Sequence, residues 1–221
     1  MIVKICGLST SETLAAALDA GADMVGFVHY ARSPRHVPLA AAPALVAQVA
    51  GRAPKTLLTV HADDELLSAA IKAFAPDILQ LHGAETPARV AAIREKFGRP
   101  VMKAIGLGTV ADLDKIGAYE AFADMLLFDA QPTDAAALPG GNGRAFDWTL
   151  LAGRSFAKPW LLGGGLTADN VGAAIAATGA PGVDVSSGVE SARGVKDIGK
   201  IVRFIAAARA TEKLGSLAKS G

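Results

Sequence analysis

The sequence predicts a single (β/α)8 barrel, the fold in which eight parallel strands alternate with helices around a closed sheet. Short runs rich in Val, Ile, Leu and Phe alternate with longer Ala-rich segments of helical periodicity. Eight such units fit a compact barrel, whereas an open doubly wound sheet more often has about five or six strands. A chain of 221 residues, 51% of them hydrophobic, can bury one large core. We therefore expect one barrel domain over residues 1–211 and a flexible tail over residues 212–221.

The predicted strands are short, apolar and bounded by turn residues. They are residues 2–6, 24–28, 56–60, 78–82, 101–105, 125–129, 160–164 and 183–187. The segments predicted to be helical are residues 11–20, 39–50, 63–75, 86–97, 109–122, a shorter piece at 146–153, 167–179 and 195–213. Each of them can turn an apolar face toward a sheet. The longest stretch without a helical pattern, residues 130–145, is rich in Gly, Pro and Asp, and we expect a mobile loop there that acts as a lid.

Composition and charge exclude several classes of protein. The chain has 22 Lys and Arg residues against 21 acidic residues, so a net charge of +1 gives no general attraction to nucleic acid or to a membrane surface. The single cysteine, Cys6, excludes an internal disulfide and suits a reducing compartment. The N-terminus is too short for a secretory signal, and no apolar run reaches about 18 residues. We expect a soluble, cytoplasmic monomer or homodimer with no nucleic-acid or membrane partner.

Chemically versatile residues gather at the predicted strand ends, where barrels of this class hold their active sites. Lys4 and Cys6 share one face of the first strand, and a nearby cation favours a reactive thiolate, although buried cysteines are often only small hydrophobes. Asp129 closes an apolar run, so it either points into a polar site or holds a loop amide. Asp184 either binds a substrate hydroxyl or braces the serine-rich loop that follows it.

The loop arginine and the histidines have weaker signals. Arg35, in the segment RSPRH, suits bidentate recognition of a carboxylate, although a lone loop arginine is often only a solvated charge. His82 ends the fourth predicted strand before a glycine turn, whereas His29, His36 and His61 fit loop or core positions. Cys6, His61 and His82 are suitable zinc ligands by type, but they lack close ligand spacing, so we expect no metal.

Two glycine-rich segments follow the last two predicted strands. In the segment LLGGGLTADNV the glycines at 163–165 allow backbone amides to approach a ligand, and Thr167 is predicted to be a helix N-cap. The segment VSSGVES, residues 185–191, can begin a short helix whose free amides favour an anion. In these barrels the two loops frequently form a phosphate site. The segment GGNGRAF at 140–146 lacks the Gly-Lys-Ser/Thr ending of a P-loop, so we expect no nucleotide site there.

Six segments, in order along the chain from residue 4 to about residue 197, together resemble the phosphoribosylanthranilate isomerase family of tryptophan biosynthesis. They are KICGLS, GADMVGFVHYARSPRHV, LQLHGAE, GGNGRAFDW, GGGLTADNV and GVDVSSGVESARGVKD. The sequence departs from the family pattern at His29 and His36, where aromatic residues are expected, at His61, where a small polar residue is usual, and at Gly163, where alanine is usual. These departures concern the shape of the anthranilate pocket.

The resemblance implies an Amadori rearrangement of N-(5-phosphoribosyl)anthranilate to 1-(2-carboxyphenylamino)-1-deoxyribulose 5-phosphate without a cofactor. It implies that Asp129 is the general acid, which protonates the furanose ring oxygen, and that Cys6 is the general base, which removes the C2' proton. Arg35 is implied to contact the anthranilate carboxylate. The residues implied to complete the site are Lys4, His82 and Asp184 for the substrate, and Gly164, Gly165, Ser187 and Gly188, whose amides hold the phosphate.

Two alternatives remain open at the level of sequence. Another sugar-phosphate isomerase or epimerase barrel would share the phosphate cradle but not the pairing of Cys6 on the first strand with Arg35. A barrel that binds a phosphorylated metabolite without turnover would keep the glycine loops but would need neither Cys6 nor Asp129. A small phosphorylated molecule is the expected partner in every case.

Overall fold

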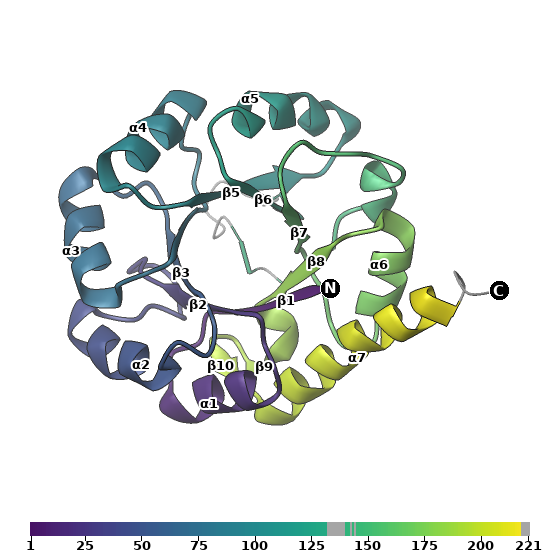
Figure 1. Cartoon of the computed structure of the whole chain (residues 1–221), viewed down its shortest axis with the longest axis horizontal. Helices are drawn as coiled ribbons and strands as arrows, with labels where there is room; N and C mark the ends of the chain where they lie inside the picture. The colour runs from purple at the N-terminus through teal and green to yellow at the C-terminus, as the bar shows by residue number, and fades with distance from the viewer. Residues whose placement is uncertain (132–139, 142, 144, 218–221) are drawn as a thin grey trace.

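The computed structural model describes residues 1–131, 140, 141, 143 and 145–217, with side chains described as far as residue 211. Eight parallel strands form a closed barrel in which neighbours in the chain are neighbours in the sheet and β8 returns to β1 (Figure 1). The strands are β1 (Ile2–Cys6), β2 (Met24–Val28), β3 (Lys55–Thr59), β4 (Ile78–Leu81), β5 (Val101–Leu107), β6 (Met125–Ala130), β7 (Trp160–Leu162) and β8 (Gly182–Val185). The predicted fold class is confirmed.

Helices surround the barrel and cover the outer face of the sheet (Figure 1). The α-helices are α1 (Ser11–Asp19), α2 (Ala42–Val49), α3 (Asp64–Phe74), α4 (Pro87–Phe97), α5 (Ile116–Glu120), α6 (Val171–Thr178) and α7 (Ile198–Leu217). The short 3-10 helices are η1 (Leu39–Ala41), η2 (Val110–Lys115), η3 (Trp148–Leu151) and η4 (Ser187–Val189). A two-stranded hairpin, β9 (Glu190–Ala192) and β10 (Val195–Lys196), lies between β8 and α7.

Polar residues fix the starts of several helices. The side chains of Thr10, Asp63 and Thr86 each accept a hydrogen bond from a backbone amide in the first turn of α1, α3 and α4, respectively. The prediction that Thr167 is an N-cap is wrong, because α6 begins after Asn170. The carboxamide of Asn170 instead accepts from the Thr167 amide at 2.7 Å and donates to the Gly165 carbonyl at 3.0 Å. One side chain therefore closes the loop that follows β7.

The apolar core has two parts. The larger part fills the space between the sheet and the helices. A smaller cluster of Ile78, Met102, Ala104, Leu127 and Leu161 packs with Ile2, Met24 and Met125, the first residues of β1, β2 and β6. Buried polar side chains begin further along the strands, with Lys4 and Gln80 fully buried. The polar part of the barrel therefore lies toward the carboxyl ends of the strands.

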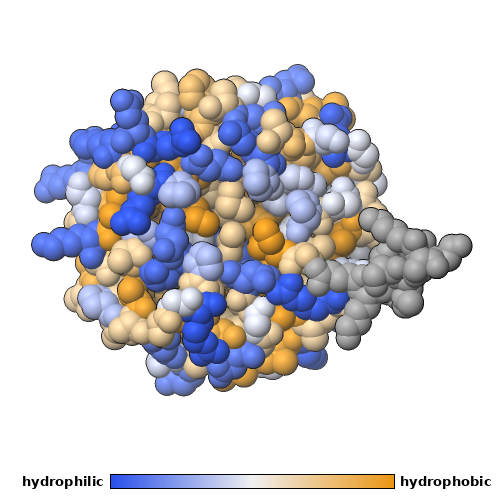
Figure 2. Space-filling view, viewed as in Figure 1, coloured by the Kyte–Doolittle hydropathy of each residue, from blue (hydrophilic) through white to orange (hydrophobic). Residues whose placement is uncertain are grey.

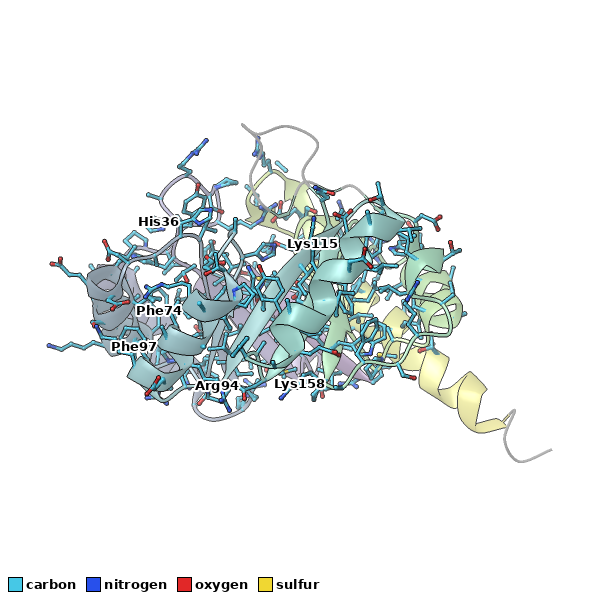
Figure 3. The ribbon with its side chains drawn as sticks, turned by 90° about the horizontal axis from the view of Figure 1, so that it is seen from above. His36, Phe74, Arg94, Phe97, Lys115 and Lys158 are labelled. Carbon is cyan, nitrogen blue, oxygen red and sulfur yellow. The ribbon has the colours of Figure 1, made fainter. Side chains whose placement is uncertain are left out.

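The two ends of the barrel are distinguished in the side view (Figure 3). His36 and Lys115, which follow β2 and β5, lie at one end, whereas Arg94, Phe97 and Lys158 lie at the other. Figure 2 shows the end at which the strands begin, where hydrophilic residues are interspersed among hydrophobic ones. In the part of the chain that the structure describes, no helix is long and apolar enough to cross a membrane.

Some predicted boundaries shift. Strand β5 continues to Leu107, and β7 ends at Leu162, two residues earlier than predicted; Gly164 has a positive φ angle, which is incompatible with a strand. Helix α7 continues to Leu217, into the segment predicted as a flexible tail, and residues 218–221 lie outside the described residues. Most of the predicted lid, namely residues 132–139, 142 and 144, also lies outside them. The single-domain boundary and the lid stay predictions.

Candidate active site

A cavity opens at the carboxyl ends of the strands, and we call it the strand-end cavity. Its lining residues come from loops and strands across the whole sequence: Cys6, Val28, Tyr30, Ser33, Arg35, Leu58, Val60, His82, Asp129, Gly140, Gly141, Asp184 and Ser186. Five predicted site residues meet here, because parallel strands bring their carboxyl ends to one end of the barrel. The lining combines apolar side chains, which suit an aromatic ring, with charged and polar groups.

A second hollow lies at the opposite end of the barrel. It is lined by residues of α4 and of the segments that precede β5 and β6, including Arg94, Arg99, Phe122 and Asp124. Arg94 and Asp124 are joined there in an ion pair at 2.9 Å. Active sites of (β/α)8 barrels occur at the carboxyl ends of the strands. The strand-end cavity is therefore the candidate active site.

Cys6 is the last residue of β1, and its thiol is buried. It pairs in the sheet with Gly26 of β2, and a side chain at Gly26 would come within 2.9 Å of the sulfur. Burial raises the pKa of the Cys6 thiol, and Asp184 adds to this effect, while Lys4 and Lys196 oppose it. Nearby lysines do lower the pKa of the thiol, as expected from the sequence, but the loss of hydration on burial raises it by more. In this state Cys6 is held as a neutral thiol.

This balance predicts an alkaline titration of the only cysteine. We expect thiolate absorbance near 240 nm, taken as the difference between the native chain and a Cys6→Ser variant, to appear mainly above pH 9.0, the ordinary value for a thiol. The titration is expected to shift to higher pH because burial disfavours the charged thiolate. A thiolate already formed at neutral pH would show that the lysines dominate instead.

Lys4 lies deeper in the barrel than Cys6 and is fully buried. Sheet register places it opposite Asp184, and its Nζ donates to Asp184 Oδ1 at 2.7 Å. Burial lowers the pKa of Lys4, but attraction to Asp184 and to Cys6 outweighs this, so the pKa is raised overall. Lys4 does not line the strand-end cavity, whereas Asp184 does. Asp184 lines the cavity, and its hydrogen-bond partner among the described residues is Lys4 and not the serine loop, so contact with a substrate hydroxyl stays the prediction.

Asp129 lies near the end of β6 and faces His82, which follows β4. Its Oδ2 is 3.2 Å from His82 Nε2, and its Oδ1 accepts a hydrogen bond from the Ala130 amide at 2.8 Å. The side-chain amide of Gln80 lies 2.9 Å from the other ring nitrogen of His82. A side chain at Gly140 would collide with both His82 and Asp129. One oxygen of Asp129 therefore accepts from the amide that ends β6, and the other lies beside His82 in the lining of the cavity.

Arg35 is buried in the loop after β2, which contradicts the alternative of a solvated surface charge. Its Nε and Nη2 donate to the two carboxylate oxygens of Glu190 at 2.6 and 2.9 Å, and Nη2 also donates to the Gly141 carbonyl at 3.1 Å. Burial raises the pKa of Glu190, but Arg35, Lys196 and the Gly194 amide lower it to about 2 overall. Sequence reasoning missed Glu190 and Lys196, although both lie in a segment that carried the family resemblance.

The glycine loops after β7 and β8 lie against each other. Gly164 and Gly165 have φ angles of +78° and +66°, which favour glycine, and a side chain at Gly188 would collide with the Leu166 carbonyl. Ser187 and Gly188 begin η4, so the predicted extra helix is a single 3-10 turn. Its first two amides have no partner within the helix. The two loops are in contact as predicted for a shared site, and phosphate binding by their amides stays a prediction.

The histidines at the sequence departures lie outside the cavity lining. His29 and His36 stack with ring centroids 4.9 Å apart, and burial together with the charge of His29 lowers the pKa of His36. The His61 ring lies beside the Ala84 amide. Among the described residues no group of three or more His, Cys, Asp or Glu side chains could hold a metal ion, so Cys6, His61 and His82 do not form a metal cluster.

The fold and the strand-end cavity together define an enzyme of the (β/α)8-barrel class, with a thiol and a carboxyl group facing one small-molecule site. A family model described as N-(5'-phosphoribosyl)anthranilate (PRA) isomerase matches residues 3–207. The chain belongs to the PRA isomerase family.

Individual relatives agree with this assignment. The chain is 61% identical over 210 residues to the N-(5'-phosphoribosyl)anthranilate isomerase of Azorhizobium caulinodans, covering 95% of this chain and 92% of the relative. It is equally similar, over 209 residues, to that of Beijerinckia indica subsp. indica, covering 95% and 94%.

Solved structures share the fold. The phosphoribosyl anthranilate isomerase of Thermotoga maritima superposes with a TM-score of 0.84 at 31% identity, covering 95% of this chain and all of that one. A PRA isomerase in complex with reduced 1-(o-carboxyphenylamino)-1-deoxyribulose 5-phosphate superposes with a TM-score of 0.79 at 29% identity, with the same coverage. The family match does not favour the two alternatives left open by the sequence.

Proposed function

We propose that this chain catalyses the Amadori rearrangement of N-(5'-phosphoribosyl)anthranilate in tryptophan biosynthesis, with Asp129 as general acid and Cys6 as general base. The observation that carries the proposal is that these two residues, which end strands far apart in the sequence, border one cavity together with Arg35. Membership of the PRA isomerase family supports the reaction itself. The roles of individual residues are those that the family resemblance implies, and their place around one cavity supports them.

The first step needs an acid. The protonated carboxyl of Asp129 donates its proton to the furanose ring oxygen while the bond from that oxygen to C1' breaks. The lone pair of the anthranilate nitrogen then forms the iminium C1'=N bond. The carboxyl of Asp129 is oriented for this step, because Oδ1 is held by the Ala130 amide while Oδ2 stays on the cavity side with His82.

The second step needs a base. Cys6 takes the proton from C2', the C–H electron pair forms a C1'=C2' double bond, and the iminium electrons return to nitrogen. The resulting enolamine tautomerises to the ketone. Burial disfavours the thiolate in the free enzyme, while Lys4, Lys196 and the positive charge of the iminium all favour it. The base is therefore activated when the substrate cation forms beside it.

The rest of the cavity positions the substrate. The apolar residues Val28, Leu58 and Val60 suit the aromatic ring, and Arg35 suits its carboxylate. Asp184 and His82 border the space left for the ribose hydroxyls. The amides of Gly164, Gly165, Ser187 and Gly188 would take the phosphate, where the loops after β7 and β8 meet. Lys4 acts through Asp184 and Cys6 and does not contact the substrate directly.

The direct test is the fluorescence decay of phosphoribosylanthranilate on addition of the purified chain. Acceleration over the spontaneous decay, with formation of the carboxyphenylamino-deoxyribulose phosphate, is the expected result. A chain that binds the reduced product analogue without accelerating the decay would be a metabolite-binding barrel instead.

The proposed assembly is a monomer or homodimer in the cytoplasm. A Thermotoga maritima relative of 30% identity, with a TM-score of 0.81, was solved as monomers of a dimeric phosphoribosylanthranilate isomerase. That likeness supports a compact barrel that folds with or without a partner copy. Light scattering of the purified chain distinguishes the two states.

Replacing Arg35 by methionine tests the carboxylate contact. We expect KM to rise and kcat to fall, with kcat/KM reduced by about 30-fold or more, since a buried charge-assisted contact is lost and Glu190 keeps only one of its two cationic partners, Lys196. Steady-state kinetics by fluorescence measure both constants. The substitution Arg52→Met is a suitable control, because Arg52 forms an exposed ion pair with Asp19 outside the cavity lining. An unchanged KM in the folded Arg35 variant would contradict the contact.

A further inference from the structure

The β9–β10 hairpin places an acid and a lysine directly behind Arg35. Glu190 of β9 accepts two hydrogen bonds from Arg35, and Lys196 of β10 donates to Glu190 Oε1 at 2.8 Å. The Gly194 amide donates to Glu190 Oε2 at 2.9 Å. Glu190 is only 8% exposed, so these contacts are shielded from solvent. Glu190 has no role in the chemical steps derived above, and Lys196 enters them only through its charge near Cys6.

The guanidinium group of Arg35 can bind a carboxylate at either of two edges, and Glu190 occupies one of them. Glu190 takes the fork formed by Nε and Nη2, which leaves the end-on side, formed by Nη1 and Nη2, without a carboxylate. We call it the free fork, although its Nη2 donates to the Gly141 carbonyl. That side meets the loop at Gly141, whose carbonyl accepts from Nη2 and whose missing side chain would come within 2.6 Å of Nη1. Arg35 and Gly141 both line the strand-end cavity. The free fork therefore points toward the substrate site.

The charges of the cluster are not balanced. Arg35 and Lys196 are positive and Glu190 is negative, so the three side chains carry a net charge of +1 in a buried position. Such a charge is expensive to bury without a counter-ion. A substrate carboxylate on the free fork of Arg35, in place of the Gly141 carbonyl, supplies the missing negative charge.

The hairpin also connects the two ends of the site. Lys196 donates to the carbonyl and hydroxyl oxygens of Ser186, at the start of the loop that leads into η4, at 2.8 and 3.1 Å. A side chain at Gly194 would come within 2.8 Å of the Pro34 carbonyl, so the turn of the hairpin lies against the loop that carries Arg35. The hairpin is thus fixed between the Arg35 loop and the predicted phosphate loop.

We propose that Glu190 is a positioning and specificity residue, which holds Arg35 so that its free fork selects substrates with a carboxylate on the aromatic ring. This inference rests on the proposed function, because it takes the Arg35 contact with the anthranilate carboxylate as given. The hydrogen bonds to Glu190 prevent the guanidinium from rotating, and a fixed fork recognises a planar carboxylate better than a mobile one.

The test compares two ligands on two variants. The ligands are reduced 1-(o-carboxyphenylamino)-1-deoxyribulose 5-phosphate and the same compound without its carboxyl group, with dissociation constants measured by titration calorimetry. The variants are Glu190→Gln and, as a matched control, Glu85→Gln. Glu85 is also a buried glutamate paired with a buried lysine, Lys103, at 2.9 Å, but it does not line the cavity or contact Arg35.

In the native chain, we expect loss of the ligand carboxyl group to weaken binding by about 30-fold, which is typical of a buried charge-assisted contact. In Glu190→Gln this ratio should fall to about 3-fold or less, because the loss of a fixed guanidinium outweighs the added attraction from the positive charge that Glu190 no longer balances. In Glu85→Gln it should stay at the native value. A merely structural role for Glu190 would weaken both ligands equally and leave the ratio unchanged, which would overturn the inference.

The experiment also covers two other outcomes, equal binding of both ligands by the native chain and failure of Glu190→Gln to fold. If the native chain binds both ligands equally, the Arg35 contact in the proposed function fails, and the inference fails with it. If Glu190→Gln does not fold, as judged by circular dichroism, Glu190→Asp takes its place. Aspartate keeps the negative charge beside Arg35 and Lys196, but it is one methylene too short to hold both nitrogens of the fork. The same fall in the ratio is expected, and a native ratio in this variant would overturn the inference.

Discussion

Replacing Cys6 by serine is expected to lower kcat for phosphoribosylanthranilate by about 10²- to 10⁴-fold, the range for loss of a general base. A serine hydroxyl is nearly isosteric with the thiol but far less acidic, so it cannot take the C2' proton at neutral pH. The positive charges of Lys4 and Lys196, which favour a thiolate at Cys6, do not make up for this difference, because a serine alkoxide forms far less readily than a thiolate. Single-turnover fluorescence decay measures the chemical step directly.

The fold of this variant should be unaffected. Cys6 is packed beside Gly26 and makes no disulfide, so the smaller oxygen leaves the sheet intact. The thermal unfolding midpoint and the affinity for the reduced product analogue should both stay close to those of the native chain. Near-native turnover in a folded Cys6→Ser variant would sink the assignment of Cys6 as base.

Replacing Asp129 by asparagine is expected to have an effect of similar size, about 10²- to 10⁴-fold in kcat. The amide can still accept the Ala130 hydrogen bond through its oxygen, so the end of β6 is held as before. It has no carboxyl proton to give to the furanose oxygen, and its NH2 group replaces Oδ2 opposite His82 Nε2. The variant removes the acid without removing the side chain.

A matched control is available at the other end of the barrel. Asp77 lies just before β4 and does not line the cavity. Its carboxylate accepts hydrogen bonds from the backbone amide and the Nζ of Lys55, the first residue of β3. Asp77→Asn removes the same charge and should leave kcat unchanged. If Asp129→Asn keeps its turnover, or if both variants lose it together, Asp129 is not the acid.

Much of the site could be predicted because it is local to single strands. The two-residue period places Lys4 and Cys6 on one face of β1, and the strand-end rule places Asp129 and His82 at the active end. The glycines after β7 were predicted from sequence to let backbone amides approach a ligand, and Gly164 and Gly165 have positive φ angles, which favour glycine. These features depend on neighbours within a few residues.

Other features depend on contacts between distant segments. Glu190 and Arg35 are 155 residues apart, and Lys4 and Asp184 are 180 residues apart, so no local pattern indicates either ion pair. Thr167 was predicted to be the N-cap of α6, but the helix begins after Asn170, whose side-chain carboxamide accepts a hydrogen bond from the Thr167 amide. The thiol of Cys6 was expected to be activated by a cation, but the extent of its burial, which reverses the net effect, exists only in the folded barrel.

By itself, the sequence determined that this protein is a (β/α)8 barrel with a thiol, a carboxyl group and two glycine loops at one end, since apolar periodicity and residue type fix which side chains a strand can present. Only the tertiary structure decided which charges meet. Closure of the sheet between β1 and β8 brings Asp184 to Lys4, and the β9–β10 hairpin brings Glu190 to Arg35. The energies of buried charges depend on distances and solvent exclusion, and these are set only when the barrel has closed.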